Sequence, residues 1–247
     1  MKNIFTTFCL LFVLLSCDSE SANDCVKKSG NIVKREIHDI PTFNKIRIEK
    51  GVELILSQDS QQKIEIETGE NLIKDVSVQV IDGELIVKNN ISCNWFRNYN
   101  PAKAYVTFTE ISRIYSVSQY KIHSNQVLSF DHIELSAGVY HEAIASEFNL
   151  IIHCNHLKIN ANDATYLNLS GNTNSMVVAF WGGEPRIDAS NLKANSIEIF
   201  QRSSNDMVLH PTNEIKGNIY STGNVVLKNI PTDIDVTQHY TGKLIID

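Results

Sequence analysis

The chain has 247 residues, of which 43% are hydrophobic and 20% are charged, and its formal net charge is −6 at pH 7. This length and apolar content can bury a sizeable core in one elongated domain or in two small ones. Acidic and basic residues are scattered along the sequence, which therefore lacks the basic stripe typical of nucleic-acid-binding proteins, and we expect no nucleic-acid partner.

The first 16 residues predict a lipoprotein signal peptide. A short basic start precedes an apolar run, residues 4–15, that is too short to span a bilayer as a mature helix. The run ends in Leu14-Leu15-Ser16-Cys17, which resembles the bacterial lipobox. We expect Cys17 to be lipidated and to anchor the mature chain to the outer membrane, on its surface or its periplasmic face. The alternative is an ordinary signal peptide with a chance cysteine.

Residues 17–30 are polar and acidic without periodicity, and they predict a flexible tether. Three further cysteines, Cys25, Cys93 and Cys154, remain after signal cleavage, and two of them could pair in an oxidising compartment. Cys25 and Cys93 lie in loop-like stretches and form the favoured pair. Cys154 ends the apolar run Leu150-Ile151-Ile152 and predicts a buried thiol. The sequence alone does not fix the connectivity.

Residues 31–88 predict strands joined by tight turns. Their apolar and β-branched residues alternate with polar ones, and Asp82-Gly83 is a strong hairpin signal. Only residues 70–74 favour a short helical turn. The region is therefore predicted to be all-β.

Between residues 89 and 131 the periodicity weakens, and residues 91–101 predict a loop by their Asn and Pro content. This loop carries Trp95, Phe96 and Tyr99. Exposed aromatic side chains can stack on sugars or anchor a protein interface, so these residues are candidate binding residues. The alternative is that they cover seams of the fold.

From residue 157 to residue 209 short apolar groups return at a step of ten residues. The groups are Leu157-Ile159-Ala161, Leu167-Leu169-Gly171, Val177-Ala179, Ile187-Ala189, Ile197-Ile199 and Met207-Leu209. Equal strand-turn units predict a solenoid, because each unit can stack on an equivalent one. Trp181-Gly182-Gly183 interrupts the pattern with a tryptophan at a glycine turn, which makes Trp181 another candidate binding residue.

The opening and the end of the mature chain resemble a known family. Phe43-Asn44-Lys45-Ile46, residues 51–58, residues 80–87 and Gly242-Lys243-Leu244-Ile245-Ile246 are similar to the putative auto-transporter adhesins with the head GIN domain (DUF2807), common in Bacteroidetes. The resemblance covers about residues 31–247 as a single domain. It implies a right-handed parallel β-helix, with two or three ten-residue steps in each coil, and a role in adhesion.

Solenoid ends expose backbone edges and need caps. The N-terminal β region and residues 243–247 are the predicted caps. The Asn-rich corners, at Asn160, Asn162, Asn168, Asn172, Asn191 and Asn195, are interpreted as turn residues that tolerate left-handed backbone angles. The alternative is a polar binding strip.

Candidate chemistry is sparse. His153 and His156 could share a metal ion only if the chain turns at Asn155, and no second ligand cluster stands at metal-like spacing, so we expect no metal and no cofactor. Sugar-cleaving β-helices gather carboxylates on one outer strip. Here the acidic residues Glu134, Asp163, Asp188, Glu198 and Asp206 are spread out.

The sequence therefore favours a non-enzymatic, envelope-anchored β-helical lipoprotein that binds a carbohydrate or a protein. A polysaccharide-active enzyme and a structural or envelope-stress component are the alternatives.

Overall fold

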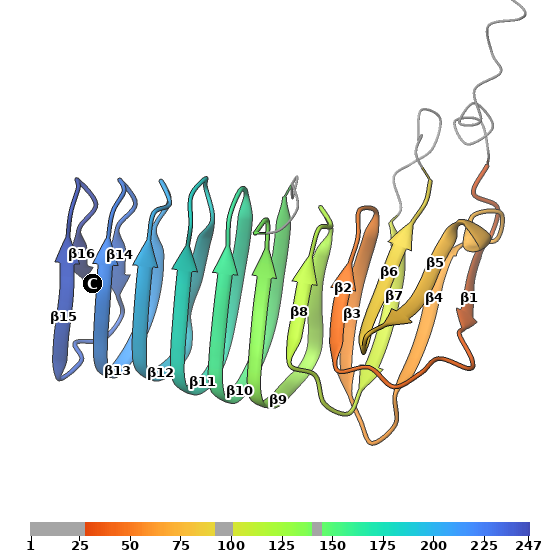
Figure 1. Cartoon of the computed structure of the whole chain (residues 1–247), viewed down its shortest axis with the longest axis horizontal. Coiled ribbons are helices and arrows are strands. Elements are labelled where there is room, and N and C mark those ends of the chain that lie inside the picture. Colours follow the sequence, from red (N-terminus) through yellow and green to blue (C-terminus); the bar gives the residue numbers. More distant parts are fainter. Residues whose placement is uncertain (1–27, 92–100, 140–144) are drawn as a thin grey trace, which may run out of the picture.

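A computed structural model describes residues 28–91, 101–139 and 145–247 of the chain. Apart from one 3₁₀ turn, η1 (Ile73–Asp75), the regular structure of these residues is entirely β. Figure 1 shows the strands stacked along one long axis, with β1 near one end and the C-terminal coils at the other. None of the described residues belongs to a helix long and apolar enough to cross a membrane.

The N-terminal region is a mixed sheet, as expected of a cap. Its strands are β1 (Ile32–Glu36), β2 (Lys45–Ile48), β3 (Val52–Gln58), β4 (Lys63–Gly69), β5 (Val76–Ile81), β6 (Glu84–Asn89), β7 (Ala102–Phe108) and β8 (Arg113–Ser116). Antiparallel pairs join β1 to β4, β4 to β7 and β5 to β6. The predicted hairpin is confirmed, because Asp82 and Gly83 connect β5 to β6 with φ angles of 50° and 73°.

The rest of the chain forms a parallel β-solenoid, which confirms the predicted β-helix. Its strands are β9 (Lys121–Ala137), β10 (Ser146–Ala161), β11 (Thr165–Phe180), β12 (Arg186–Gln201), β13 (Met207–Ile219), β14 (Val225–Leu227), β15 (Asp233–Gln238) and β16 (Leu244–Ile246). Leu157 pairs with Met176, which pairs with Ile197. A coil is therefore about 20 residues long and contains two of the ten-residue steps.

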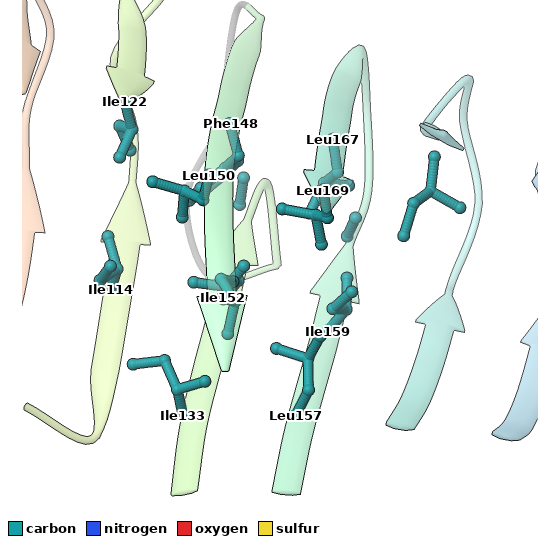
Figure 2. Packing of buried hydrophobic residues seen from close by; sticks show 14 of the residues in the cluster. Ile114, Ile122, Ile133, Phe148, Leu150, Ile152, Leu157, Ile159, Leu167 and Leu169 are labelled. Carbon is teal, nitrogen blue, oxygen red and sulfur yellow. The ribbon is translucent and has the colours of Figure 1, made fainter. Parts of the chain in front are cut away.

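The core fills the interior of the stack. One cluster of buried side chains runs from Phe43 in the N-terminal region to Leu227 in β14. In Figure 2 Leu150 and Ile152 of β10 lie beside Leu167 and Leu169 of the next coil. Burying a side chain of this size contributes about 1.5–3 kcal/mol relative to leaving it exposed, so each coil stabilises its neighbours.

One apolar group lies a residue away from its predicted position. Val177 and Ala179 were expected in the interior. Ala179 is buried, but Val177 is not, and the core cluster is filled from the alternate positions by Met176, Val178 and Phe180. Val177 points outward and is 38% exposed. Every residue from 176 to 180 is apolar, so polar alternation does not mark the inward positions there, and the register is set by pairing with Leu157 and Ile159.

The predicted backbone role of the asparagines is wrong. Among the described residues other than glycine, positive φ angles occur at Asp39, Asp82 and Asp163. The long strands β10, β11 and β12 instead pass through a corner while remaining extended. Asn155 and His156, both exposed between inward-facing neighbours, mark the corner of β10.

The C-terminal stretch does not cap the stack, which corrects the expectation for residues 243–247. Among the described strands, β16 pairs only with β14 and β15 pairs only with β13, so each strand of the last coil has one edge that no described strand covers. Ile234 and Ile246 continue the inward rows of Ile215 and Leu227, yet they are 43% and 50% exposed. The end of the core is thus open to solvent.

Candidate binding surface

Four ring side chains form a row on the outer surface, one from each of four successive coils. Trp181 follows β11, Phe200 lies near the end of β12, Tyr220 follows β13 and His239 follows β15. Neighbouring ring centroids are 4.9 Å apart for Trp181 and Phe200, 5.2 Å for Phe200 and Tyr220, and 4.4 Å for Tyr220 and His239. We call these four residues the aromatic row.

The backbone and two asparagines hold the aromatic row in place. The backbone N–H groups of Trp181, Tyr220 and His239 each donate to a carbonyl of the preceding coil, at distances of 3.1, 2.7 and 2.8 Å. The indole Nε1 of Trp181 donates to Oδ1 of Asn160 at 3.4 Å, and Nε2 of His239 lies 2.8 Å from Oδ1 of Asn218. Asn160 in turn donates to Oε1 of Glu134 at 2.9 Å. The rings are therefore oriented before any ligand arrives.

The aromatic row covers a seam between coils and still faces solvent. Trp181 is 48% exposed and Tyr220 is 40% exposed, whereas Phe200 is half-buried between them. The planes of Tyr220 and His239 differ by only 8°, so these two rings cover each other. The free parts of Trp181 and Tyr220 are consequently the apolar surface that a ligand can reach.

Polar side chains border the row on one side. Glu198, Lys216, Asn218, Asp235 and Thr237 line a shallow, open depression across β12, β13 and β15. Asn218 belongs to both features, because it also contacts His239. A sugar has an apolar face and hydroxyl groups. The rings can contact the apolar face, and the neighbouring amide and carboxylate groups can bind the hydroxyls.

Charged residues alternate in sign along this face of the solenoid. Arg113 pairs in register with Glu134, and Glu134 with Lys158. Further along, Glu198 pairs with Lys216, and Lys216 with Asp235. Lys158 and Lys216 therefore lie between the carboxylates of Glu134, Glu198 and Asp235 along this face.

The other acidic residues considered from the sequence serve local structure. Asp188 accepts a hydrogen bond from the backbone of Ser190, and Asp206 accepts one from the backbone of Asn224. Asp163 occupies a turn with a φ of 52°. These residues do not join Glu134 or Glu198 in one strip.

The histidines considered as metal ligands lie on either side of the corner at Asn155, and both are exposed. His156 stacks on His132, with centroids 4.4 Å apart, and its Nδ1 lies 2.7 Å from Oγ of Ser175. Within the described ranges, no group of three or more His, Cys, Asp or Glu side chains could hold a metal ion.

Cys154 is a free and buried thiol, as the sequence indicates. It is 9% exposed, and its Sγ lies 3.3 Å from Oγ1 of Thr173. Burial raises the pKa of the Cys154 thiol above its ordinary value, and the contact with Thr173 opposes this shift. The side chain is part of the core.

The remaining candidate residues lie outside the described ranges. They are Cys17, Cys25, Cys93, Trp95, Phe96 and Tyr99. Of the predicted binding residues, the structure therefore places Trp181. Phe200, Tyr220 and His239 were missed, although a ring recurs at a step of about 20 residues, within β12 for Phe200 and directly after the strand for Trp181, Tyr220 and His239.

Solved structures share this fold. A crystal structure of a putative adhesin from Bacteroides fragilis is similar with a TM-score of 0.78 and 18% identity, covering 88% of this chain and 97% of that one. A putative lipid binding protein from Parabacteroides distasonis has a TM-score of 0.62 and 16% identity, covering 87% and 97%. A putative adhesin from Parabacteroides merdae has a TM-score of 0.59 and 18% identity, covering 89% and 98%.

No curated protein matches the chain. The sequence profile of the family described as "Putative auto-transporter adhesin, head GIN domain" matches residues 42–231, which is most of the chain and includes all of the solenoid up to the last coil. The chain therefore belongs to the family of putative auto-transporter adhesins with the head GIN domain.

Proposed function

We propose that this protein is a non-enzymatic binding module, anchored by a lipid on Cys17 to the bacterial outer membrane, and that it contacts a carbohydrate through the aromatic row. The observation that carries the proposal is the row itself. The Trp181 ring is held by its hydrogen bond to Asn160, the Tyr220 ring packs between Phe200 and His239, and both remain accessible to solvent. A rigid aromatic surface loses little conformational entropy on binding.

A carbohydrate fits better than a protein because of what surrounds the rings. The depression beside the row offers amide, carboxylate, hydroxyl and ammonium groups from five side chains within one face. These groups match sugar hydroxyls, whereas the core of a protein interface is depleted of charged residues. The names of the family and of its similar structures, which refer to adhesion, support binding as the general role.

Cleavage of a polysaccharide is less well supported. Glycosidases need two carboxylates that flank the scissile bond, separated by about 5–9.5 Å according to the stereochemistry. On the face that carries the aromatic row, Lys216 stands in register between Glu198 and Asp235. This arrangement favours binding of hydroxyl groups over acid and base catalysis.

A glycan array probed with the mature chain carrying Cys17→Ser tests the proposal. We expect binding to one class of glycan and a loss of at least about tenfold in affinity for Trp181→Ala and for Tyr220→Ala, because aromatic anchors dominate such contacts. Ile81→Ala is the matched control, since Ile81 is 48% exposed but belongs to β5 in the N-terminal region. Binding to no glycan, or equal loss in the control, would overturn the carbohydrate assignment.

A further inference from the structure

The two ends of the solenoid differ in how far charged residues and neighbouring strands cover the outermost strand. At the N-terminal end the outer strand β1 presents exposed Lys34, Arg35 and Glu36, and the next apolar rows are covered, with Ile66 only 1% exposed. Charged residues on an edge strand discourage pairing with another strand. At the C-terminal end the last coil has no such cover within the described residues.

The last coil offers both unpaired backbone and apolar side chains. The free edges of β15 and β16 carry N–H and C=O groups that another strand could pair with. Ile230, Ile234, Tyr240 and Ile246 are exposed by 68%, 43%, 65% and 50%. An isolated exposed isoleucine is ordinary, but several around one open core end form an interaction surface.

We propose that the last coil pairs with the same coil of a second copy, giving a two-fold symmetric, end-to-end dimer. In such a dimer β15 lies antiparallel to β15 of the second copy, and β16 lies antiparallel to β16. The exposed inward rows of the two copies then cover each other. The core of one solenoid continues into that of the other.

Charge complementarity selects this arrangement. Asp233 and Asp247 lie at one end of the terminal strands, whereas His239 and Lys243 lie at the turn that joins β15 to β16. Antiparallel pairing of like strands brings the acidic end of one copy against the Lys243 end of the other. Pairing centred on Ile245 places each Lys243 opposite an Asp247, whose carboxylate also pairs with Lys228 of its own chain. Pairing β15 with β16 would instead bring the two acidic ends together.

The proposed interface is small and self-complementary. A strand of six residues is about 20 Å long and packed sheets are about 10 Å apart, so the end of one coil buries less than the roughly 800 Å² per partner of a standard interface. A reversible dimer that forms with increasing concentration is expected. The aromatic row reaches this coil at His239, and Asp235 and Thr237 of the depression belong to β15. The dimer is therefore tested with Ile234 and Lys243, which belong to neither feature.

Sedimentation velocity on the mature chain carrying Cys17→Ser, over a wide range of concentrations, tests the dimer. We expect Ile234→Lys to raise the dimer dissociation constant by roughly tenfold or more, and Lys243→Glu to weaken it as well. The double variant Lys243→Glu with Asp247→Lys restores both charge pairs between the copies, although it removes the Lys228–Asp247 pair within each copy, and it should dimerise more strongly than Lys243→Glu alone. Ile32→Lys, at the 57% exposed Ile32 of β1, is the control and should leave the dimer unchanged.

Melting temperatures measured in parallel establish that each variant is folded. A wild-type chain that stays monomeric at every concentration would overturn the proposal. Dissociation by the Ile32→Lys control would move the interface to the other end of the stack and would overturn it too. Failure of the double charge swap to restore the dimer would contradict the two-fold arrangement.

Discussion

Gly171 lies against the backbone of Ile152, its register partner on the preceding coil. A Cβ at Gly171 would stand 2.1 Å from the carbonyl oxygen of Ile152, and Gly171 has a φ of 116°. Gly217 stands in the same relationship to Ile199, with a separation of 2.0 Å and a φ of 129°. Only glycine therefore fits at positions 171 and 217. The backbone that a larger side chain would meet cannot move without disturbing the pairing of two coils.

We expect Gly171→Ala to destabilise the protein by about 2–4 kcal/mol, because the substitution combines backbone strain with overpacking. Denaturation by guanidinium, followed by circular dichroism, measures the change. Gly182→Ala is the matched control, since its Cβ would meet Oδ1 of Asn162 at 3.4 Å, an ordinary contact. Equal stability of wild type and Gly171→Ala would show that the two coils do not approach so closely.

The register of the run from Met176 to Phe180 gives a second prediction. Val178→Thr places a hydroxyl in the core and should cost about 1–3 kcal/mol, because Val178 is fully buried. Val177→Thr should change the free energy of unfolding by no more than about 0.5 kcal/mol, because Val177 points outward. The same denaturation measurement compares the two, and the opposite ranking would restore the register expected from the sequence.

The reactivity of Cys154 gives a third prediction. Burial raises the pKa of its thiol, so less of the reactive thiolate is present at pH 8, and access for a reagent is limited. In a chain whose other cysteines are replaced by serine, Cys154 should react with a thiol reagent far more slowly in the native protein than after unfolding. The coloured thiolate released by Ellman's reagent follows the reaction. Rapid native labelling would show that the site opens readily.

Asp131 gives a prediction about pH. Nδ2 of Asn155 donates to its Oδ1 at 2.7 Å, and this hydrogen bond lowers the pKa of the Asp131 carboxyl below its ordinary value. A lowered folded-state pKa means that the carboxylate favours folding above the unfolded-state pKa, and that this contribution is lost as the pH falls through the folded-state value. We expect Asn155→Ala to raise the Asp131 pKa toward normal in an NMR titration. An unchanged titration curve would assign the shift to other neighbours.

The sequence predicts the solenoid well wherever apolar residues are isolated among polar ones. Leu167 and Leu169 are examples, because Asn168 and Ser170 mark the alternate face. The pattern fails at Val177, where no polar residue distinguishes inside from outside. It also fails at residues 243–247, because the apolar run Leu244-Ile245-Ile246 predicts a strand but does not show how exposed that strand is.

The aromatic row shows why the site was only partly predictable. Trp181 stands out in the sequence because two glycines follow it. Phe200 and Tyr220 do not, because their contact depends on how many residues each corner takes up. Leu157 pairs with Met176 but Ile197 pairs with Ile215, so coil length varies slightly along the stack. Ring contacts between coils emerge only once these corners are known.

The long axis of the molecule runs from β1 at one end to the open coil at the other (Figure 1). With about 4.8 Å between paired strands, the path of 11 strands from β1 to β16 spans roughly 50 Å. A chain held to a membrane by its N-terminal segment would carry the last coil, with its free strand edges, at the end farthest from that membrane. Two such coils that meet would leave the two β1 strands about 100 Å apart at opposite ends of the pair, which is the geometry of a bridge between two membranes.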